Sequence, residues 1–196
     1  MNALELLPTD LRVDIIGQVR AGTLRPRQLL TVGADPKTVK GESKRIRTAI
    51  LYGTPHTGSG IVNNCPYASK ACAAACLNTA GRGDPRIGTT VQRARLIRSV
   101  FFHSHRAEFM RSLIAEIERF LRHCERVGMR PAFRLNGTTD TPWESIRFKG
   151  QSIMSHFEED VTFYDYTKWP IHRRPDHKLP PNYHLTFSRS EENHEE

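Results

Sequence analysis

Residues 64–83, NCPYASKACAAACLNTAGRG, contain three of the four cysteines of the chain, Cys65, Cys72 and Cys76. The alanine-rich part, residues 69–77, lacks Gly and Pro and predicts a short helix on which Cys72 and Cys76 share a face. Cys65 precedes Pro66, which favours an extended backbone, so Cys65 reaches the same point from the incoming loop. The stretch therefore predicts one metal site built from three thiolates.

Three thiols without an evident fourth ligand are typical of an iron–sulfur cluster with one open iron position, and a 4Fe-4S cluster is the first expectation. Zinc is the alternative, held by these thiols and a histidine, of which His56 is the nearest in sequence. The spacing matches none of the zinc patterns built from paired CxxC motifs. A disulfide with one free thiol is the third interpretation, and the sequence leaves all three open.

The fourth cysteine, Cys124, lies elsewhere in the sequence pattern. It continues an apolar stripe at helical spacing that includes Phe109, Leu113, Ile117 and Phe120. A cysteine in such a position behaves as a small apolar residue. Cys124 is therefore predicted to be a core residue and not a fourth ligand.

Length and composition indicate a soluble protein. The chain has 196 residues, enough for one domain with a sizeable core. It contains no run of ~18 apolar residues that could span a membrane. The N-terminus, MNALELLPTDLRVD, has charges and a proline where a signal peptide needs an apolar segment. We therefore expect a cytoplasmic protein, a setting in which clustered cysteines bind metal more often than they pair.

The formal net charge of +8 is typical of proteins with an anionic partner such as nucleic acid, although many soluble proteins are simply basic. The strongest candidate surface is residues 82–111, a predicted helical region with two acidic residues. Its arginines are Arg82, Arg86, Arg93, Arg95, Arg98, Arg106 and Arg111.

Helical and strand patterns alternate along the chain. An amphipathic helix is predicted at residues 9–21, within an N-terminal region of residues 1–30, and an exposed basic loop at 31–45. Thr141-Pro142-Trp143-Glu144 has the form of a capping box at the start of a helix. Strands are predicted at 46–52, 131–136, 161–166 and 183–188, with long helices between the first two.

This order predicts an α/β fold with a mainly parallel sheet and flanking helices, either an open sheet or a partial, TIM-like barrel. The metal-cluster loop follows the first predicted strand. The single α/β domain is predicted to span residues 31–190, and an acidic tail, residues 191–196, follows it.

Polar residues follow each predicted strand. Because parallel strands end at the same edge of a sheet, where active groups gather, we expect these residues to line a mouth beside the cysteine loop. They are Thr54, His56, Asn136, Thr138, Thr139, Asp140, Asp165, Tyr166, Thr167, Lys168, Ser188 and Arg189.

Four of the mouth residues are candidate catalytic residues. Asp140 and Asp165 are expected to orient a hydroxyl or amine, Lys168 to neutralise a phosphate or carboxylate, and Tyr166 to donate a hydrogen bond or relay a proton or electron. Each also has a structural interpretation as a turn residue, a packed ring or a solvated charge. Candidate cofactor contacts are Arg82 and Arg86, which would offset the negative charge of a cluster, and Asn136 at the mouth.

Four segments, NCPYASKACAAACLNTAGRG, FRLNGTTDTPWE, FYDYTKWP and NYHLTFSRSE, make the sequence resemble the bacteriophage gene product 88 domain family over about residues 50–190. This resemblance implies a phage or prophage origin, and hence the host cytoplasm. The chain also resembles, more loosely, radical S-adenosylmethionine enzymes, which place a three-cysteine cluster loop after the first strand of a partial barrel. Their CxxxCxxC spacing differs from the Cys-x6-Cys-x3-Cys found here. That likeness implies a cluster on the three cysteines, with S-adenosylmethionine as a candidate cofactor.

Three functional hypotheses follow. The first is an iron–sulfur enzyme of redox or radical type acting on a nucleic acid or nucleotide. The second is a non-enzymatic nucleic-acid-binding protein, serving phage replication, with a structural zinc or iron–sulfur site. The third is a phage inhibitor of a host protein. Metal content and colour distinguish the first from the second, and a stable host complex without either activity indicates the third.

Overall fold

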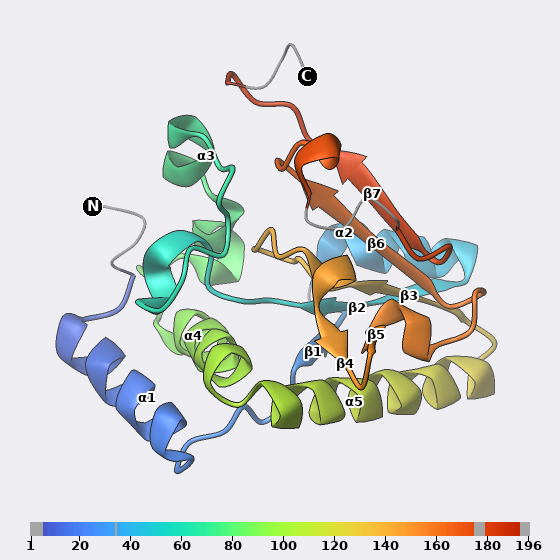
Figure 1. Ribbon diagram of the computed structural model, residues 1–196, viewed down its shortest axis with the longest axis horizontal. Coiled ribbons are helices and arrows are strands. Elements are labelled where there is room, and N and C mark those ends of the chain that lie inside the picture. Colours follow the sequence, from blue (N-terminus) through green and yellow to red (C-terminus); the bar gives the residue numbers. More distant parts are fainter. Residues whose placement is uncertain (1–5, 34, 175–178, 193–196) are drawn as a thin grey trace.

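A computed structural model describes residues 6–33, 35–174 and 179–192 of the chain. Its centre is a five-stranded sheet with the strand order β1-β2-β3-β6-β7 (Figure 1). β1 runs antiparallel to β2, and the other neighbouring pairs are parallel. The α/β fold with a mainly parallel sheet is therefore confirmed. The strands are β1 (Leu30–Val32), β2 (Ile46–Leu51), β3 (Arg130–Arg134), β6 (Thr162–Thr167) and β7 (Tyr183–Phe187).

The sheet is open. From β2 to β7, each new parallel strand lies next to the previous one and always on the same side of it. Crossover connections of one handedness produce this order. In the described part of the chain, β1 and β7 each have one neighbour, so the sheet does not close. The open sheet is one of the two predicted forms, and a TIM-like barrel is not confirmed.

Long helices form a layer on one side of the sheet (Figure 1). They are α1 (Thr9–Ala21), α4 (Thr90–Ser104) and α5 (Arg106–Arg126), with α1 packed against α4. The predicted N-terminal helix is confirmed: its Ile15 and Val19 are buried, and it ends at Gly22, which has a φ of 81°. α1 thus adds these side chains to the common core.

The predicted apolar stripe of α5 packs on the sheet. Phe120 meets Phe133 of β3 with 5.4 Å between the ring centroids, and Phe133 stacks on Phe163 of β6 at 5.1 Å. Cys124 ends the stripe and is fully buried, which confirms it as a core residue. Burial of these side chains between helix and sheet contributes hydrophobic stabilisation to the fold.

Two predictions that concern the chain before β2 are wrong: the exposed basic loop at residues 31–45, and the strand at 46–52 as the first strand of the sheet. Residues 31–45 are not a plain loop, because they contain the end of β1 and two short helices, α2 (Pro36–Val39) and η1 (Lys40–Lys44). β1 also comes before β2, so the cysteine loop follows the second strand and not the first. β1 is three residues long, too short to show a periodicity in the sequence, and it exists through its pairing with β2.

The predicted capping box at Thr141–Glu144 is also wrong. Pro142 precedes only a single turn, η5 (Trp143–Ser145), which has no side-chain cap. A small hairpin, β4 (Arg147–Phe148) and β5 (Gln151–Ser152), follows, and then the turn η6 (Met154–His156). Glu144 does not cap a helix because its carboxylate binds the buried Arg174.

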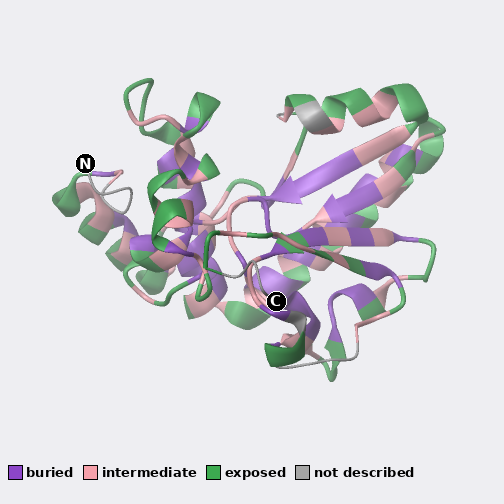
Figure 2. Cartoon of the chain, turned by 90° about the horizontal axis from the view of Figure 1, so that it is seen from above, coloured by how far each residue is buried: buried purple, intermediate pink, exposed green. Residues whose placement is uncertain are grey.

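The alternation of side chains gives the sheet two different faces. Phe133 and Phe163 face the helices, whereas Arg134, one residue after Phe133, and Tyr166, three residues after Phe163, belong to the opposite face. Figure 2 looks onto this side, where the strands are largely buried and the short helix α2 is exposed. Arg134 is the last residue of β3 and Tyr166 the last but one of β6, so both lie at the carboxyl ends of their strands.

Two further expectations concern the ends of the chain and membranes. In the predicted acidic tail, Glu191 and Glu192 are described, and residues 193–196 lie outside the described residues.

Within the described ranges, every helix is too short or too polar to cross a lipid bilayer.

Candidate functional site

A cleft of about 360 Å³ opens at the carboxyl ends of the parallel strands. Cys65, Cys72 and Cys76 all line it, although in sequence they stand up to about 120 residues from the other lining residues. Of the predicted mouth residues, those that line the cleft are His56, Asn136, Thr138, Thr139, Asp140, Tyr166, Thr167, Lys168, Ser188 and Arg189. The structure thus brings these residues together, while Thr54 and Asp165 do not line the cleft.

The cysteine loop is less helical than its sequence predicts. α3 covers only Lys70–Ala74, with the hydroxyl of Ser69 accepting the N–H of Cys72 as its cap. Cys76 is extended and precedes the turn η3 (Leu77–Thr79). The prediction that Cys72 and Cys76 share a helix face is therefore wrong, and both reach the cleft because the loop curves around it.

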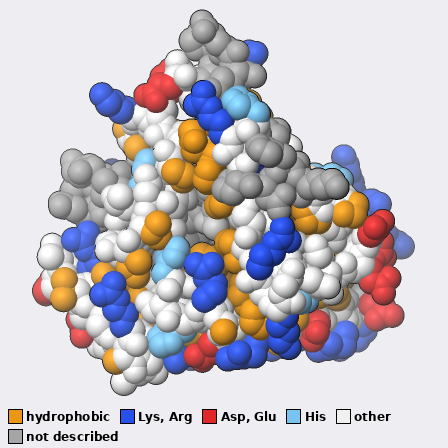
Figure 3. Space-filling view, in the orientation of Figure 1, with side chains coloured by type: hydrophobic (Ala, Val, Ile, Leu, Met, Phe, Trp, Pro, Cys, Tyr) orange, Lys and Arg blue, Asp and Glu red, His pale blue; other side chains and the backbone are white. Residues whose placement is uncertain are grey.

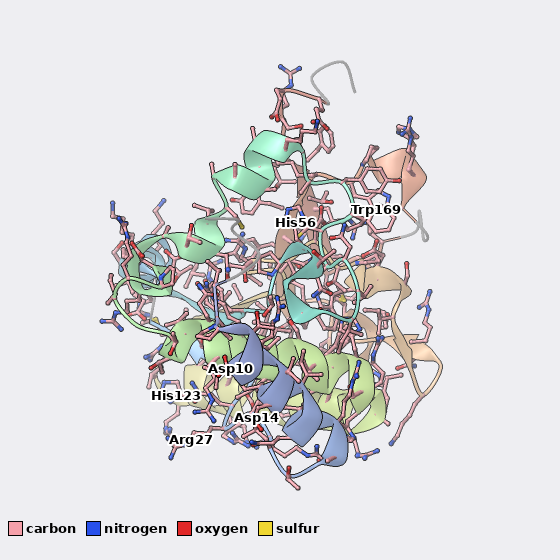
Figure 4. The ribbon with its side chains drawn as sticks, turned by 90° about the vertical axis from the view of Figure 1, so that its left-hand side faces the viewer. Asp10, Asp14, Arg27, His56, His123 and Trp169 are labelled. Atoms are coloured by element: carbon pink, nitrogen blue, oxygen red, sulfur yellow. The ribbon has the colours of Figure 1, made fainter. Side chains whose placement is uncertain are left out.

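Loop contacts hold the cysteine segment over the strand ends. Tyr67 packs on Trp169, which follows β6, with 4.9 Å between the ring centroids. Figure 4 shows Trp169 and His56 in the same upper part of the molecule, far from Asp10 and Asp14 of α1. His56, the histidine considered for zinc, lines the cleft with the cysteines. Burial lowers the pKa of His56, which favours the neutral imidazole that binds metals.

The three loop cysteines are free thiols in a partly buried setting. The Cys65 thiol donates a long hydrogen bond to the carbonyl oxygen of Thr138 at 3.9 Å. Burial raises the pKa of Cys65 to about 12, and the nearby Asp140 and the other two thiols act in the same direction. A thiolate here therefore needs a neighbouring cation, which a bound metal provides.

The thiols line a common space without converging on one point. In the described part of the chain, no group of three or more His, Cys, Asp or Glu side chains is arranged to hold a single metal ion. The small side chains of Ala68 and Ala75 line the same space. A four-iron cluster takes each thiolate on a different iron, so it requires thiols around a space and not around one ion. The cleft lining therefore combines three thiols with small side chains.

The returning end of the cysteine loop, near Asn78, is anchored in the helix layer. Arg95 of α4 donates from Nη1 to both the carbonyl and the side-chain oxygen of Asn78 at 2.6 Å. Gln92 donates to the carbonyls of Asn78 at 2.8 Å and Gly83 at 2.5 Å. Gly83 is required here, because a Cβ would lie 2.3 Å from the Asn78 carbonyl oxygen. This anchor was not predicted from the sequence.

Arg95 also changes the interpretation of the arginine-rich segment. Four of its arginines are engaged within the protein: Arg86 with Asp84, Arg95 with Asn78, Arg98 with the Gln28 carbonyl and Arg106 with the Phe102 carbonyl. Arg82, Arg93 and Arg111 are exposed. In Figure 3, Lys and Arg side chains are spread over the visible face and do not gather on one element. Arg82 and Arg86 do not line the cleft, so the structure does not place them beside a ligand there.

Asp140 lies at the inner wall of the cleft and is held by a buried ionic network. Its Oδ2 accepts the backbone N–H of Lys168 at 2.8 Å, and its Oδ1 lies 3.5 Å from Nη1 of Arg174. Arg174 is fully buried, donates to both carboxylate oxygens of Glu144 at 2.5 and 3.0 Å, and binds Thr167 at 2.8 Å. The network fixes Asp140 and the start of the loop after β6.

Lys168 connects two segments at the rim of the cleft. Its Nζ donates to the hydroxyl of Ser188 at 3.1 Å and to the carbonyl of Arg189 at 2.5 Å. Beyond these residues, Glu191 accepts the N–H of Ala71 in α3 at 3.2 Å. The chain after β7 therefore ties the cysteine helix to the sheet, and Lys168 already has two acceptors before any ligand binds.

Asp165 is fully buried behind the cleft. Its Oδ1 accepts the backbone N–H of Asn136 at 2.8 Å, and its Oδ2 accepts the hydroxyl of Tyr183 at 3.1 Å. Asp165 thus positions Asn136, which lines the cleft, and has no direct access to a ligand. Burial raises the pKa of Asp165 to about 7 from 3.8, although the hydrogen bond from Asn136 and the charge of Arg134 lower it.

We expect this buried carboxyl to make stability depend on pH. The folded state keeps the proton of Asp165 up to about pH 7, whereas the unfolded chain releases it near pH 3.8. The free energy of unfolding therefore falls as the pH rises through this range. Urea midpoints measured from pH 4 to 8 should decrease less for Asp165→Asn than for the wild type. Asp160→Asn, an exposed control just before β6, should keep the wild-type dependence; equal slopes for all three proteins contradict the assignment.

Arg134 is a cleft residue that the sequence analysis missed. It lies at the end of β3, on the sheet face away from the helices, and its guanidinium lies 5.1 Å from the ring centroid of Tyr166. In the sequence it looked like one more alternating strand residue. Only the pairing of β3 with β6 and the position of the cysteine loop put it into the cleft wall.

The residues that build the cleft also lie within a match to a known protein family. The sequence model of the gene product 88 family matches residues 28–196, a range that includes the whole sheet, the cysteine loop and the cleft. Neither a curated protein nor a solved structure gives a significant match. The likeness to radical S-adenosylmethionine enzymes stays a prediction. Because the family match covers most of the sequence, the chain belongs to the gene product 88 family.

Proposed function

We propose that this phage-family protein holds an iron–sulfur cluster on Cys65, Cys72 and Cys76 and performs a redox or radical-type reaction on a nucleic acid or nucleotide in the adjoining cleft. One observation carries the proposal: the three thiols line the same cleft as Asp140 and Tyr166. Pockets that join a cofactor site to a few convergent polar groups are the usual form of an active site.

When bound, such a cluster supplies single electrons and, through the iron without a protein ligand, a coordination position. S-adenosylmethionine is the cofactor we propose to test for that position. The residues of the chain then have distinct tasks. Asp140, held by Lys168 N–H and Arg174, accepts a hydrogen bond from a hydroxyl or amine of the substrate. Tyr166, half-exposed at the mouth, donates from its hydroxyl.

The proposal predicts a division among the four cysteines. Protein purified without oxygen should be brown and contain iron and sulfide. We expect Cys65→Ser, Cys72→Ser and Cys76→Ser each to lose most of this iron, because each removes one thiolate ligand. Cys124→Ala is the matched control and should keep the cluster, because Cys124 lies in the core. Iron, sulfide and the visible spectrum are the measurements, and full iron retention in Cys72→Ser would overturn the assignment.

A second candidate function is a nucleic-acid-binding protein with a structural zinc site. His56 lines the cleft with the three cysteines, and zinc binding would require these four side chains to move onto one ion. Zinc takes thiolate and imidazole ligands in this number. A colourless protein with one zinc, lost in His56→Ala, together with salt-sensitive DNA binding through the exposed Arg82, Arg93 and Arg111, would favour this function over the first.

A further inference from the structure

Arg134 is a cation in the cleft wall to which no anionic side chain of the described residues is hydrogen-bonded. Its Nε is buried and has no hydrogen-bond partner, its guanidinium lies 5.1 Å from the ring centroid of Tyr166, and its charge acts on the buried Asp165. A buried donor of a charged group costs free energy when it is left unpaired. Since Arg134 also lines the open cleft, an anionic group of a ligand can meet it.

Tyr166 offers a flat surface beside this cation. It is 49% exposed, the most exposed residue of β6, and lies on the face of the sheet that α4 and α5 do not cover. Aromatic rings and guanidinium planes are the surfaces on which nucleic-acid bases stack. The pair formed by Tyr166 and Arg134, 5.1 Å apart, provides both kinds of surface in one place.

Asp140 adds an acceptor to the same cleft. Its side chain is 8% exposed, and its Oδ1, which lies 3.5 Å from Nη1 of Arg174, has no hydrogen-bond partner. The cleft wall thus has a donor atom, Arg134 Nε, and an acceptor atom, Asp140 Oδ1, that each lack a hydrogen-bond partner. A ligand that fits must combine an anionic group with a hydroxyl or amine donor, and the flat surface of Tyr166 favours a planar ring between them.

We infer that the cleft binds a nucleotide unit, with the base on Tyr166, the phosphate on Arg134 and a sugar hydroxyl or base amine on Asp140. This deepens the proposed function, on which it rests, by naming the residues that recognise the substrate. A cleft of about 360 Å³ lies within the range of pockets for molecules of this size. The same unit can come from a free nucleotide or from a single strand, which would continue over the open face of the sheet.

The test is a titration of the full-length protein, purified without oxygen, with the four deoxynucleoside 5′-monophosphates and with a six-nucleotide single-stranded DNA. We expect Arg134→Gln and Tyr166→Ala to weaken binding by about tenfold, the size typical of a lost stacking or charge-assisted contact. Tyr166→Phe should weaken binding less than Tyr166→Ala, because it keeps the ring and loses only the hydroxyl. Arg130→Gln is the matched control, since Arg130 lies on the same strand and the same face but outside the cleft.

The outcomes separate this inference from the proposed function. Binding of a monophosphate supports a free nucleotide as the source, and binding of the DNA alone supports a strand. Nucleotide binding by a protein without iron or sulfide leaves the inference standing and removes the proposed function. A brown, folded protein that binds neither probe overturns the inference alone. Equal losses in Arg134→Gln and Arg130→Gln also overturn it, because they show general charge attraction only.

Discussion

Replacement of Glu144 by alanine is expected to lower the free energy of unfolding by about 3–5 kcal/mol. The carboxylate of Glu144 and the guanidinium of Arg174 are both fully buried and joined by two hydrogen bonds. Glu144→Ala leaves the charge of Arg174 inside the protein, with Thr167 and the more distant Asp140 as its remaining partners. The unpaired charge, and not the lost attraction, accounts for most of the expected effect.

Urea unfolding followed by circular dichroism measures this change. Glu125→Ala is the matched control, because Glu125 is exposed in the last turn of α5, and its substitution should change stability by less than about 0.5 kcal/mol. The double variant Glu144→Leu, Arg174→Met removes both charges and should recover much of the loss. A loss in Glu144→Ala no larger than that of the control shows that the ion pair does not stabilise the fold.

Replacement of Arg95 by methionine is expected to cost about 3 kcal/mol, because two charge-assisted hydrogen bonds to buried oxygens disappear together. Both bonds go to Asn78, at the end of the cysteine loop, and Arg95 also lies 5.2 Å from the ring centroid of Tyr52. Gln92 still binds the Asn78 carbonyl, so the helix layer should remain folded. We therefore expect the loop at residues 76–84 to become more mobile than the rest of the chain.

Two measurements check this expectation together: chemical unfolding for the stability and limited proteolysis for cleavage within residues 76–84. Arg93→Met is the control on the same helix, two residues earlier and exposed. It should leave stability and cleavage unchanged. If the two variants behave alike, Arg95 is not an anchor of the loop.

Several features of the fold follow from local patterns and were predicted correctly. The helix at 9–21, the stripe of α5 and the strands β3, β6 and β7 each repeat apolar residues at the period of their own secondary structure. The sequence also predicted which residues lie together in the cleft. That prediction needs only one fact of topology, which is that parallel strands end at the same edge of a sheet. That is why Asn136, Asp140, Tyr166 and Lys168 appear in both the sequence prediction and the cleft lining.

The errors occur where a residue's partner is distant in the sequence. Glu144 has the spacing of a capping box, but Arg174, 30 residues later, takes its carboxylate. Arg95 belongs to a basic run that suggested an anion-binding surface, but it is buried against Asn78. Asp165 follows the pattern of the mouth residues, yet it faces the helices. No local rule distinguishes a solvated charge from one paired across the core.

The sequence by itself determined the class of the fold, the order of the main elements and the group of residues at the carboxyl edge of the sheet, because periodicity and strand direction act over short stretches of chain. The tertiary structure alone decided which charges are buried in pairs, which buried polar atoms lack a hydrogen-bond partner, and how the cysteine loop is anchored over the cleft. Those outcomes depend on burial, since the free energy of a charge or a hydrogen bond is set by what surrounds it after the chain has packed. Arg134 lies in a strand and Arg95 in a helix, and their sequence positions alone do not distinguish their roles. Packing places Arg134 in the wall of the cleft and makes Arg95 the anchor of the cysteine loop.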